Sequence, residues 1–264
     1  MRKWLAILLF ILGLGLLSFP MVSNYYTSLR QQGTLNEYKT SLQYASKKKL
    51  KEAQQSLLKQ QTYQQQTVND PFGDHSSTAY GTDPLAFISI PAIDVELPVF
   101  PGTSDKTLNR YAGLVQGTDV PIGKKNQHSL ITAHRGLPGA QLFTDLPRLE
   151  VGDKFYLKNA YGLMTYEVDN IKTIKPTTAN PVQRDPQTNQ VTLMTCTPYM
   201  INTHRLLVTG HRIPNESKSI PKAHFVWDWY KILMVALGVA VVAYLIYRLI
   251  RYFRNRKGGD SDEI

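Results

Sequence analysis

The sequence predicts a mainly β protein built around a closed or nearly closed β-barrel of seven to eight strands with short helices. From residue 84 onward, short runs rich in β-branched, aromatic and aliphatic residues alternate with turns that contain Pro and Gly. Few stretches of this region show helical periodicity, and no repeat of fixed period is visible. Many short strands in this spacing are typical of a closed barrel. The runs are Leu85–Ile90, Val95–Phe100, Ser129–Thr132, Lys154–Leu157, Leu163–Val168, Val191–Thr195 and Leu206–Val208.

Composition excludes several classes of protein. The 264 residues suffice for one large domain or two small ones, and a 42% hydrophobic content excludes general disorder. A single cysteine excludes an internal disulfide and a zinc site built on several thiolates. The net charge of +10 lies at the ends, because residues 70–229 hold 15 Lys+Arg and 15 Asp+Glu. This distribution argues against nucleic acid as a partner and indicates that the ends contact membrane lipids.

Two apolar runs, Trp4–Phe19 and Ile232–Tyr247, predict transmembrane helices. Each is slightly shorter than the roughly 20 residues that span a bilayer, and apolar flanking residues extend both. Basic residues stand at the outer tip of each run, so the positive-inside rule places both termini in the cytoplasm and residues 25–228 outside the cell membrane. We therefore expect an N-terminal anchor in residues 1–24 and a C-terminal transmembrane helix in residues 227–250. A cleaved signal peptide for the first run and a buried core helix for the second are the alternatives.

A polar segment, residues 25–69, follows the anchor and is predicted to be helical. Apolar residues recur there at helical spacing in two stretches, with a break near the basic run Lys47–Lys49. This run fits a solvated helix face or a contact with anionic lipid. At the other end of the chain, residues 251–264 form a basic and then acidic cytoplasmic tail. The periodic positions are Leu35, Tyr38, Leu42 and Ala45, and then Leu50, Ala53 and Leu57.

Cys196 is the candidate nucleophile. It ends a β-type run and is followed by Thr197-Pro198, so we expect the thiol at the rim of a sheet, exposed by the turn. The chain then returns after seven residues, and a hairpin of this length would bring Arg205 close to Cys196 on the neighbouring strand. A buried structural cysteine is the alternative.

His134 is the best placed of six histidines to serve a cysteine nucleophile. It follows the run Ser129–Thr132 and enters a Gly- and Pro-containing loop, where catalytic side chains are common. His204 would point away if Arg205 faced the site, because side chains alternate along a strand. A metal site shared by His128 and His134 is excluded because they would lie about 20 Å apart along one strand.

The segment Thr192-Leu193-Met194-Thr195-Cys196 resembles the T-L-x-T-C signature of sortases, the cysteine transpeptidases of Gram-positive cell surfaces. The resemblance spans about residues 84–213. It implies a sortase-like barrel in residues 84–226, with Cys196, His134 and Arg205 as catalytic residues. It also implies substrate binding by Thr195 and Thr197, and no metal or other cofactor.

A second resemblance narrows the class. The triplet Asp70-Pro71-Phe72 is similar to the lid of class C sortases, which polymerise pilins. The resemblance implies a lid in residues 70–83, with Asp70 paired to Arg205 and Phe72 covering Cys196. A C-terminal membrane pass is also typical of that class.

The resemblance implies an L-P-x-T-G-like sorting signal as substrate, on a pilin or another surface protein. Cys196 would form a thioester, which the lysine amine of another pilin would resolve into an isopeptide bond. The alternatives are a housekeeping sortase that anchors proteins to peptidoglycan, a non-enzymatic membrane-tethered β-domain, and a papain-like hydrolase. The last would place its cysteine near a helix start, whereas Cys196 ends a β run.

Overall fold

The computed structural model describes most of the chain between the two predicted membrane segments. The described residues are 33–41, 47–63, 70–72, 83–178, 182–215 and 219–221, with single helical positions at 13, 15, 29, 238, 241, 244, 247, 248 and 251. Two compact units divide the chain, Met1–Ala223 and His224–Ile264. The first holds all the strands described below.

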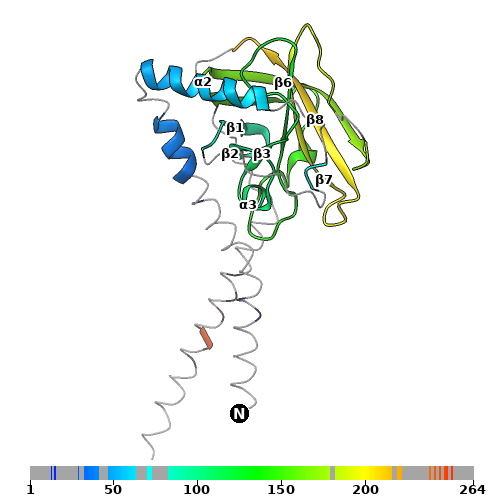
Figure 1. Ribbon diagram of the computed structural model, residues 1–264. Helices are drawn as coiled ribbons and strands as arrows, with labels where there is room; N and C mark the ends of the chain where they lie inside the picture. Colours follow the sequence, from blue (N-terminus) through cyan, green and yellow to red (C-terminus); the bar gives the residue numbers. More distant parts are fainter. Residues whose placement is uncertain are drawn as a thin grey trace, which may run out of the picture. The chain divides into compact units, whose positions relative to one another are not determined.

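Eight strands close into a barrel, which confirms the predicted fold class (Figure 1). Around the barrel the strand order is β1-β2-β3-β4-β7-β8-β6-β5. The β2–β3 and β4–β7 pairs are parallel and the others are antiparallel. The elements are β1 (Ala86–Ile90), η1 (Pro91–Ile93), β2 (Val95–Pro101), α3 (Asp105–Leu108), β3 (Ala112–Leu114), β4 (Gln127–Thr132), η2 (Leu146–Arg148), β5 (Lys154–Asn159), β6 (Gly162–Ile174), β7 (Asn189–Thr197) and β8 (His204–Ile213).

Strand β3 is the one strand of the barrel that the sequence pattern does not predict. It has only three residues and contains Gly113, which usually weakens a strand. A Cβ atom at Gly113 would collide with the carbonyl of Gly102, so this strand can pack only with glycine at that position. Strand β6 also extends beyond its predicted end at Val168, because β8 pairs with its polar second half across a bulge.

Alternating side chains give the barrel two apolar regions. The main cluster fills its interior, where Phe155 and Tyr166 stack with ring centroids 5.3 Å apart. A second group, here called the outer cluster, lies on the opposite face of β4, β7 and β8 and includes a residue of the β3–β4 connection. Its members are Val115, Leu130, Met194 and Leu207, with Ile174 and Val182 packed against them. The outer cluster matters for function because Met194 lies two residues before Cys196.

The polar N-terminal segment is helical where it is described, as predicted. Residues 33–41 form one helical stretch, and α2 (Lys47–Tyr63) begins within the basic run where a break is expected. Leu35 and Leu57 are buried, which confirms them as inward-facing positions. Gln54 of α2 donates a hydrogen bond to the carbonyl of Ala160 at 3.0 Å. These contacts attach the helices to the barrel.

The predicted membrane segments, residues 1–24 and 227–250, and positions Leu42 and Ala45 fall outside the described residues or are described only at isolated positions. Among the described residues, no helix combines the length and the apolar character needed to cross a membrane.

Candidate active site

Cys196 and Arg205 lie opposite each other on neighbouring strands. β7 and β8 pair in antiparallel register, with Cys196 facing Arg205 across the ladder, which is the juxtaposition that the hairpin predicts. The expectation of an exposed thiol is wrong: β7 continues to Thr197, and Cys196 is only 5% exposed. Regular strand pairing therefore places the thiol near the end of the β7–β8 ladder, where other parts of the chain cover it.

His134 lies at the same level of the sheet, on the other side of Cys196. The parallel ladder of β4 and β7 pairs Thr132 with Met194, and the Ala133 amide continues it by donating to the Met194 carbonyl at 3.3 Å. Two residues further along each strand than the Thr132–Met194 pair, this register brings His134 level with Cys196. The chain is fixed there, since the amide of Phe143 donates to the His134 carbonyl at 3.1 Å. The ends of β4, β7 and β8 therefore bring an imidazole, a thiol and a guanidinium to one rim of the barrel.

The guanidinium of Arg205 is held on both sides. Its Nε donates to Oδ1 of Asp70 at 2.9 Å, and its Nη2 donates to Oδ2 at 2.8 Å. Its Nη1 donates to the carbonyl oxygens of Asn202 and His204 at 2.9 and 3.0 Å. The Nε and Nη2 donors of the guanidinium, which form a planar fork, are thus both occupied by one carboxylate. These are the donors that could otherwise bind a substrate carbonyl or an oxyanion. Asp70 occupies the partner position that the lid resemblance implies.

Phe72 lies between the other two groups. Its ring centroid is 5.3 Å from that of His134 and 5.2 Å from the central guanidinium carbon of Arg205. Both distances are within the range of favourable aromatic and cation–π contacts. Since one small ring contacts both side chains, His134 and Arg205 face a common space, which Phe72 fills.

Burial sets the protonation states of this site. It raises the pKa of the Cys196 thiol; the charge of Arg205 opposes this and the carboxylate of Asp70 adds to it. It lowers the pKa of His134, against a smaller opposing effect of Asp105. Burial also disfavours the charged form of Arg205, but its hydrogen bonds to Asp70 and its electrostatic interactions with Cys196 and Asp70 raise its pKa overall. Cys196 and His134 are therefore both neutral at rest near pH 7, while Arg205 is charged.

We expect these shifts to appear in the pH dependence of Cys196 alkylation. The thiolate is the reacting form, so the rate rises with pH, and burial moves its midpoint above that of a free cysteine. Asp70→Asn removes a charge that raises the Cys196 pKa, so its midpoint should lie below that of the wild type. The measurement is the rate of reaction with iodoacetamide between about pH 6 and pH 10, a range that brackets an ordinary thiol pKa. Each rate profile is divided by its own plateau value, so that only the midpoints are compared. A wild-type midpoint at or below that of glutathione would contradict the burial argument.

The two threonines predicted to bind substrate have different surroundings. Thr195 is fully buried, and its hydroxyl donates to the Ala133 carbonyl at 2.8 Å, so it holds β4 against β7 and has no access to a ligand in this conformation. Thr197 is partly exposed and accepts a hydrogen bond from Nη1 of Arg135 at 3.2 Å. Arg135 also lies over the ring of Tyr199 at 5.6 Å. Arg135 directly follows His134 in the chain, and this position beside a candidate catalytic residue is the sequence signal that could have identified it.

No group of three or more His, Cys, Asp or Glu side chains within the described part of the chain could hold a metal ion.

Comparison with known proteins places this geometry in a family. The sortase domain matches residues 88–213. The crystal structure of sortase C-1 from Streptococcus pneumoniae is 38% identical, with a TM-score of 0.63 over 68% of this chain and 97% of that one. The pilus-related sortase C of Group B Streptococcus is 34% identical, with a TM-score of 0.63 over 68% of this chain and 96% of that one. Sortase A of Bacillus anthracis is 30% identical over 131 residues, which are 50% of this chain and 60% of that protein.

The matched region contains the rim that carries Cys196, His134 and Arg205, and the match to the solved sortase C structures covers nearly their whole length. The chain therefore belongs to the sortase family of cysteine transpeptidases, as a class C member.

Proposed function

We propose that this protein cleaves an L-P-x-T-G-like sorting signal and joins pilin subunits through an isopeptide bond to a lysine. The observation that carries the proposal is the contact of one ring, Phe72, with both His134 and Arg205, beside a Cys196 that faces Arg205 across the ladder. A thiol nucleophile, a proton donor and an anion-binding fork are the three groups that acyl transfer through a thioester requires.

Each residue has one part in the reaction. Cys196 transfers its proton to His134 and attacks the Thr carbonyl of the signal. The fork of Arg205 stabilises the oxyanion through directed hydrogen bonds. His134 then returns the proton to the leaving Gly amine, so the peptide bond breaks as the thioester remains. A lysine amine attacks this thioester and loses a proton to His134, which passes it to the departing Cys196 sulfur as the isopeptide bond forms. The thioester retains much of the energy of the cleaved bond, so the transfer proceeds without ATP.

The lid triplet Asp70-Pro71-Phe72 would regulate this reaction. Asp70 occupies the fork that the oxyanion would need, and Phe72 fills the space between the imidazole and the guanidinium. The same carboxylate raises the pKa of Cys196. Opening of the lid would therefore free the binding fork, admit the substrate and favour the thiolate together.

Removing the lid contacts is expected to speed the alkylation of Cys196. Contacts worth a few kcal/mol would change the open population, and hence the rate, by roughly 5- to 150-fold. Phe72→Ala tests steric cover alone because it removes no charge, whereas Asp70→Ala also lowers the thiol pKa. The measurement is the iodoacetamide rate at pH 7, with Asp145→Ala, which removes a partly exposed carboxylate on a turn, as the matched control. Equal rates in the wild type and in Phe72→Ala would contradict a closed lid.

The function itself is tested by intact mass spectrometry of the full chain incubated with a peptide that contains L-P-x-T-G. The expected result is a covalent adduct on Cys196 whose mass equals the peptide up to its Thr residue, less one water. A lysine-containing pilin domain added afterwards should remove the adduct and gain the peptide mass. Absence of the adduct in the wild type and in Phe72→Ala would overturn the proposal.

Anchoring to peptidoglycan is the second candidate, favoured by the 30% identity to a sortase A. The two candidates share the thioester and differ in the acceptor. To distinguish the two candidates, equal amounts of a lysine-bearing pilin domain and of a peptidoglycan cross-bridge amine are added to the preformed adduct. The product that accumulates identifies the preferred acceptor.

We place the protein at the cell membrane, with the catalytic barrel outside and both termini in the cytoplasm. The support is the pair of apolar runs with basic outer tips, Trp4–Phe19 and Ile232–Tyr247. In this arrangement the helical segment 25–69 and the lid 70–83 connect the anchor to the barrel.

A further inference from the structure

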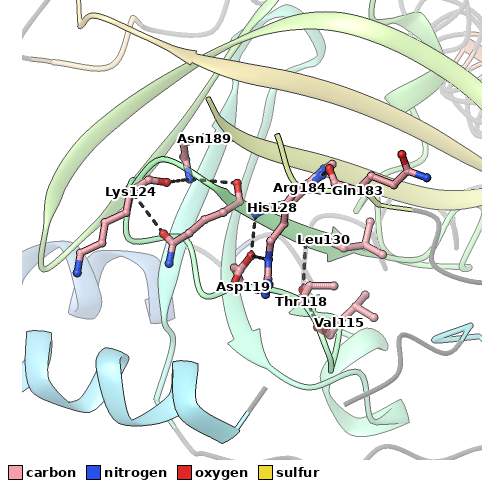
Figure 2. Close-up of polar contacts among 10 residues, drawn as sticks. Val115, Thr118, Asp119, Lys124, His128, Leu130, Gln183, Arg184 and Asn189 are labelled. Carbon is pink, nitrogen blue, oxygen red and sulfur yellow. Dashed lines mark hydrogen bonds and ion pairs between the residues drawn. The ribbon is translucent and has the colours of Figure 1, made fainter. Parts of the chain in front are cut away.

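An ion pair ties two connections of the barrel together far from the rim. Arg184, between β6 and β7, donates from Nε and Nη2 to the two carboxylate oxygens of Asp119, between β3 and β4, at 2.7 and 2.9 Å (Figure 2). The Asp119 side chain is 4% exposed and also accepts the backbone N–H of His128 at 2.8 Å. Such a bidentate pair on a buried carboxylate fixes direction as well as distance.

A second contact holds the residue before Arg184. Nδ1 of His128 lies 2.7 Å from the carbonyl oxygen of Gln183, which can only accept, so Nδ1 carries the proton. Nε2 then accepts from the hydroxyl of Thr192 at 2.7 Å, and that hydroxyl is bonded to Thr209 at 2.7 Å. Burial lowers the pKa of His128, in agreement with this neutral form. Two consecutive residues are thus bonded to buried groups of the barrel wall.

These contacts determine where Val182 lies. Val182 precedes Gln183 and packs against the outer cluster, which contains Met194. Thr192, which is bonded to Nε2 of His128, lies four residues before Cys196 on β7, about 13 Å along the strand. The strip Val182–Arg184 is therefore held over the same face of the sheet that leads to the thiol, and the bonds that hold it are too far from Cys196 to touch reacting atoms.

We infer that Asp119 and Arg184 are positioning residues that fix the strip Val182–Arg184 as a wall for the donor peptide. The inference rests on the proposed function, because the peptide must lie along the face that ends at Cys196. A clamp that orients a binding wall without touching the reacting atoms affects the affinity for the peptide and leaves the chemical step unchanged. The signature is a raised KM for the donor at constant kcat.

The test compares Arg184→Ala, Asp119→Asn and the double variant in a transfer assay with an L-P-x-T-G peptide as donor. We expect each single change to raise the donor KM about tenfold and to keep kcat within about twofold. The double variant should be no worse than either single one, because both remove the same pair. Arg184→Lys should recover part of the loss, since it restores the charge and not the fork.

Two controls separate positioning from general damage. Arg148→Ala removes an exposed arginine that lies 3.9 Å from the carboxylate of Asp145, and should leave the KM unchanged. The alkylation rate of Cys196 should be the same in all variants, because the clamp does not touch the rim. Arg184 is 53% exposed, so its removal is compatible with folding, and thermal melting checks this for Asp119→Asn. An unchanged KM in folded Arg184→Ala, or a parallel fall of kcat and alkylation rate, would overturn the inference.

Failure of the proposed function would look different. In that case the wild type forms no adduct. Hydrogen–deuterium exchange over residues 182–188 then tests, without any activity assay, whether the Asp119–Arg184 pair orders the strip. Faster exchange in Arg184→Ala than in Arg148→Ala supports a clamp that orders the strip, and equal exchange overturns it.

Discussion

Replacement of Cys196 by alanine is expected to abolish both the thioester adduct and peptide transfer. The remaining groups, His134 and Arg205, can polarise a carbonyl but cannot form the covalent intermediate on which the transfer depends. The loss should be on the order of 10⁴-fold or more in kcat/KM, as expected for a nucleophile that acts together with its partners as a unit. The measurement is the rate of product formation with donor peptide and lysine acceptor in excess.

Removal of the thiol should leave the fold intact. The side chain is small, and alanine at a buried strand position opens only a small cavity. Cys196→Ala should therefore melt within a few degrees of the wild type and still bind the donor peptide. Transfer by folded Cys196→Ala at a rate comparable to the wild type would rule out the thioester mechanism.

Arg205→Lys should cause the second largest loss. A lysine keeps the positive charge but offers no planar fork, so the bonds that would stabilise the oxyanion lose their direction. Loss of an oxyanion donor costs about 10²-fold in kcat, and we expect a decrease of that size with a smaller change in KM. The matched control is Arg148→Lys, which makes the same chemical change at an exposed position.

The lid gives this variant a second expected effect. Arg205 holds Asp70 through two parallel bonds, and a lysine can supply only a point charge there. Alkylation of Cys196 should therefore be faster in Arg205→Lys even as transfer is slower. A parallel decrease of both rates would mean that the change distorts the rim, and the assignment of Arg205 to the oxyanion would then fail.

Much of the rim is predictable because it follows from strand geometry. A β run that ends at Cys196, followed by a short return to Arg205, leaves little freedom in how the two side chains meet. His134 is predictable for a related reason, since it ends another run that enters a loop. The contact of Asp70 with Arg205, over 135 positions, has no such local cause and comes from the family resemblance alone.

Other features have no signature in local patterns. Strand β3 is too short to show alternation, and its Gly113 is required by a backbone approach that depends on the folded barrel. The pair of Asp119 with Arg184 joins positions 65 residues apart, neither of which belongs to a motif. The burial of Cys196 was mispredicted because the extension of β7 to Thr197 depends on its pairing with His204 in β8.

The position of the lid triplet along the chain has a consequence for where the protein can work. Asp70 follows seven residues after α2 ends at Tyr63, and α2 is bonded to the barrel through Gln54. As the inhibitory segment of the proposed function, the triplet on so short a tether would compete at a local concentration in the millimolar range, whatever the dilution of the protein. A dilute peptide in solution would be a poor competitor. A sorting signal confined to the same membrane surface would meet the rim at a comparable local concentration, so confinement in two dimensions would itself act as the trigger.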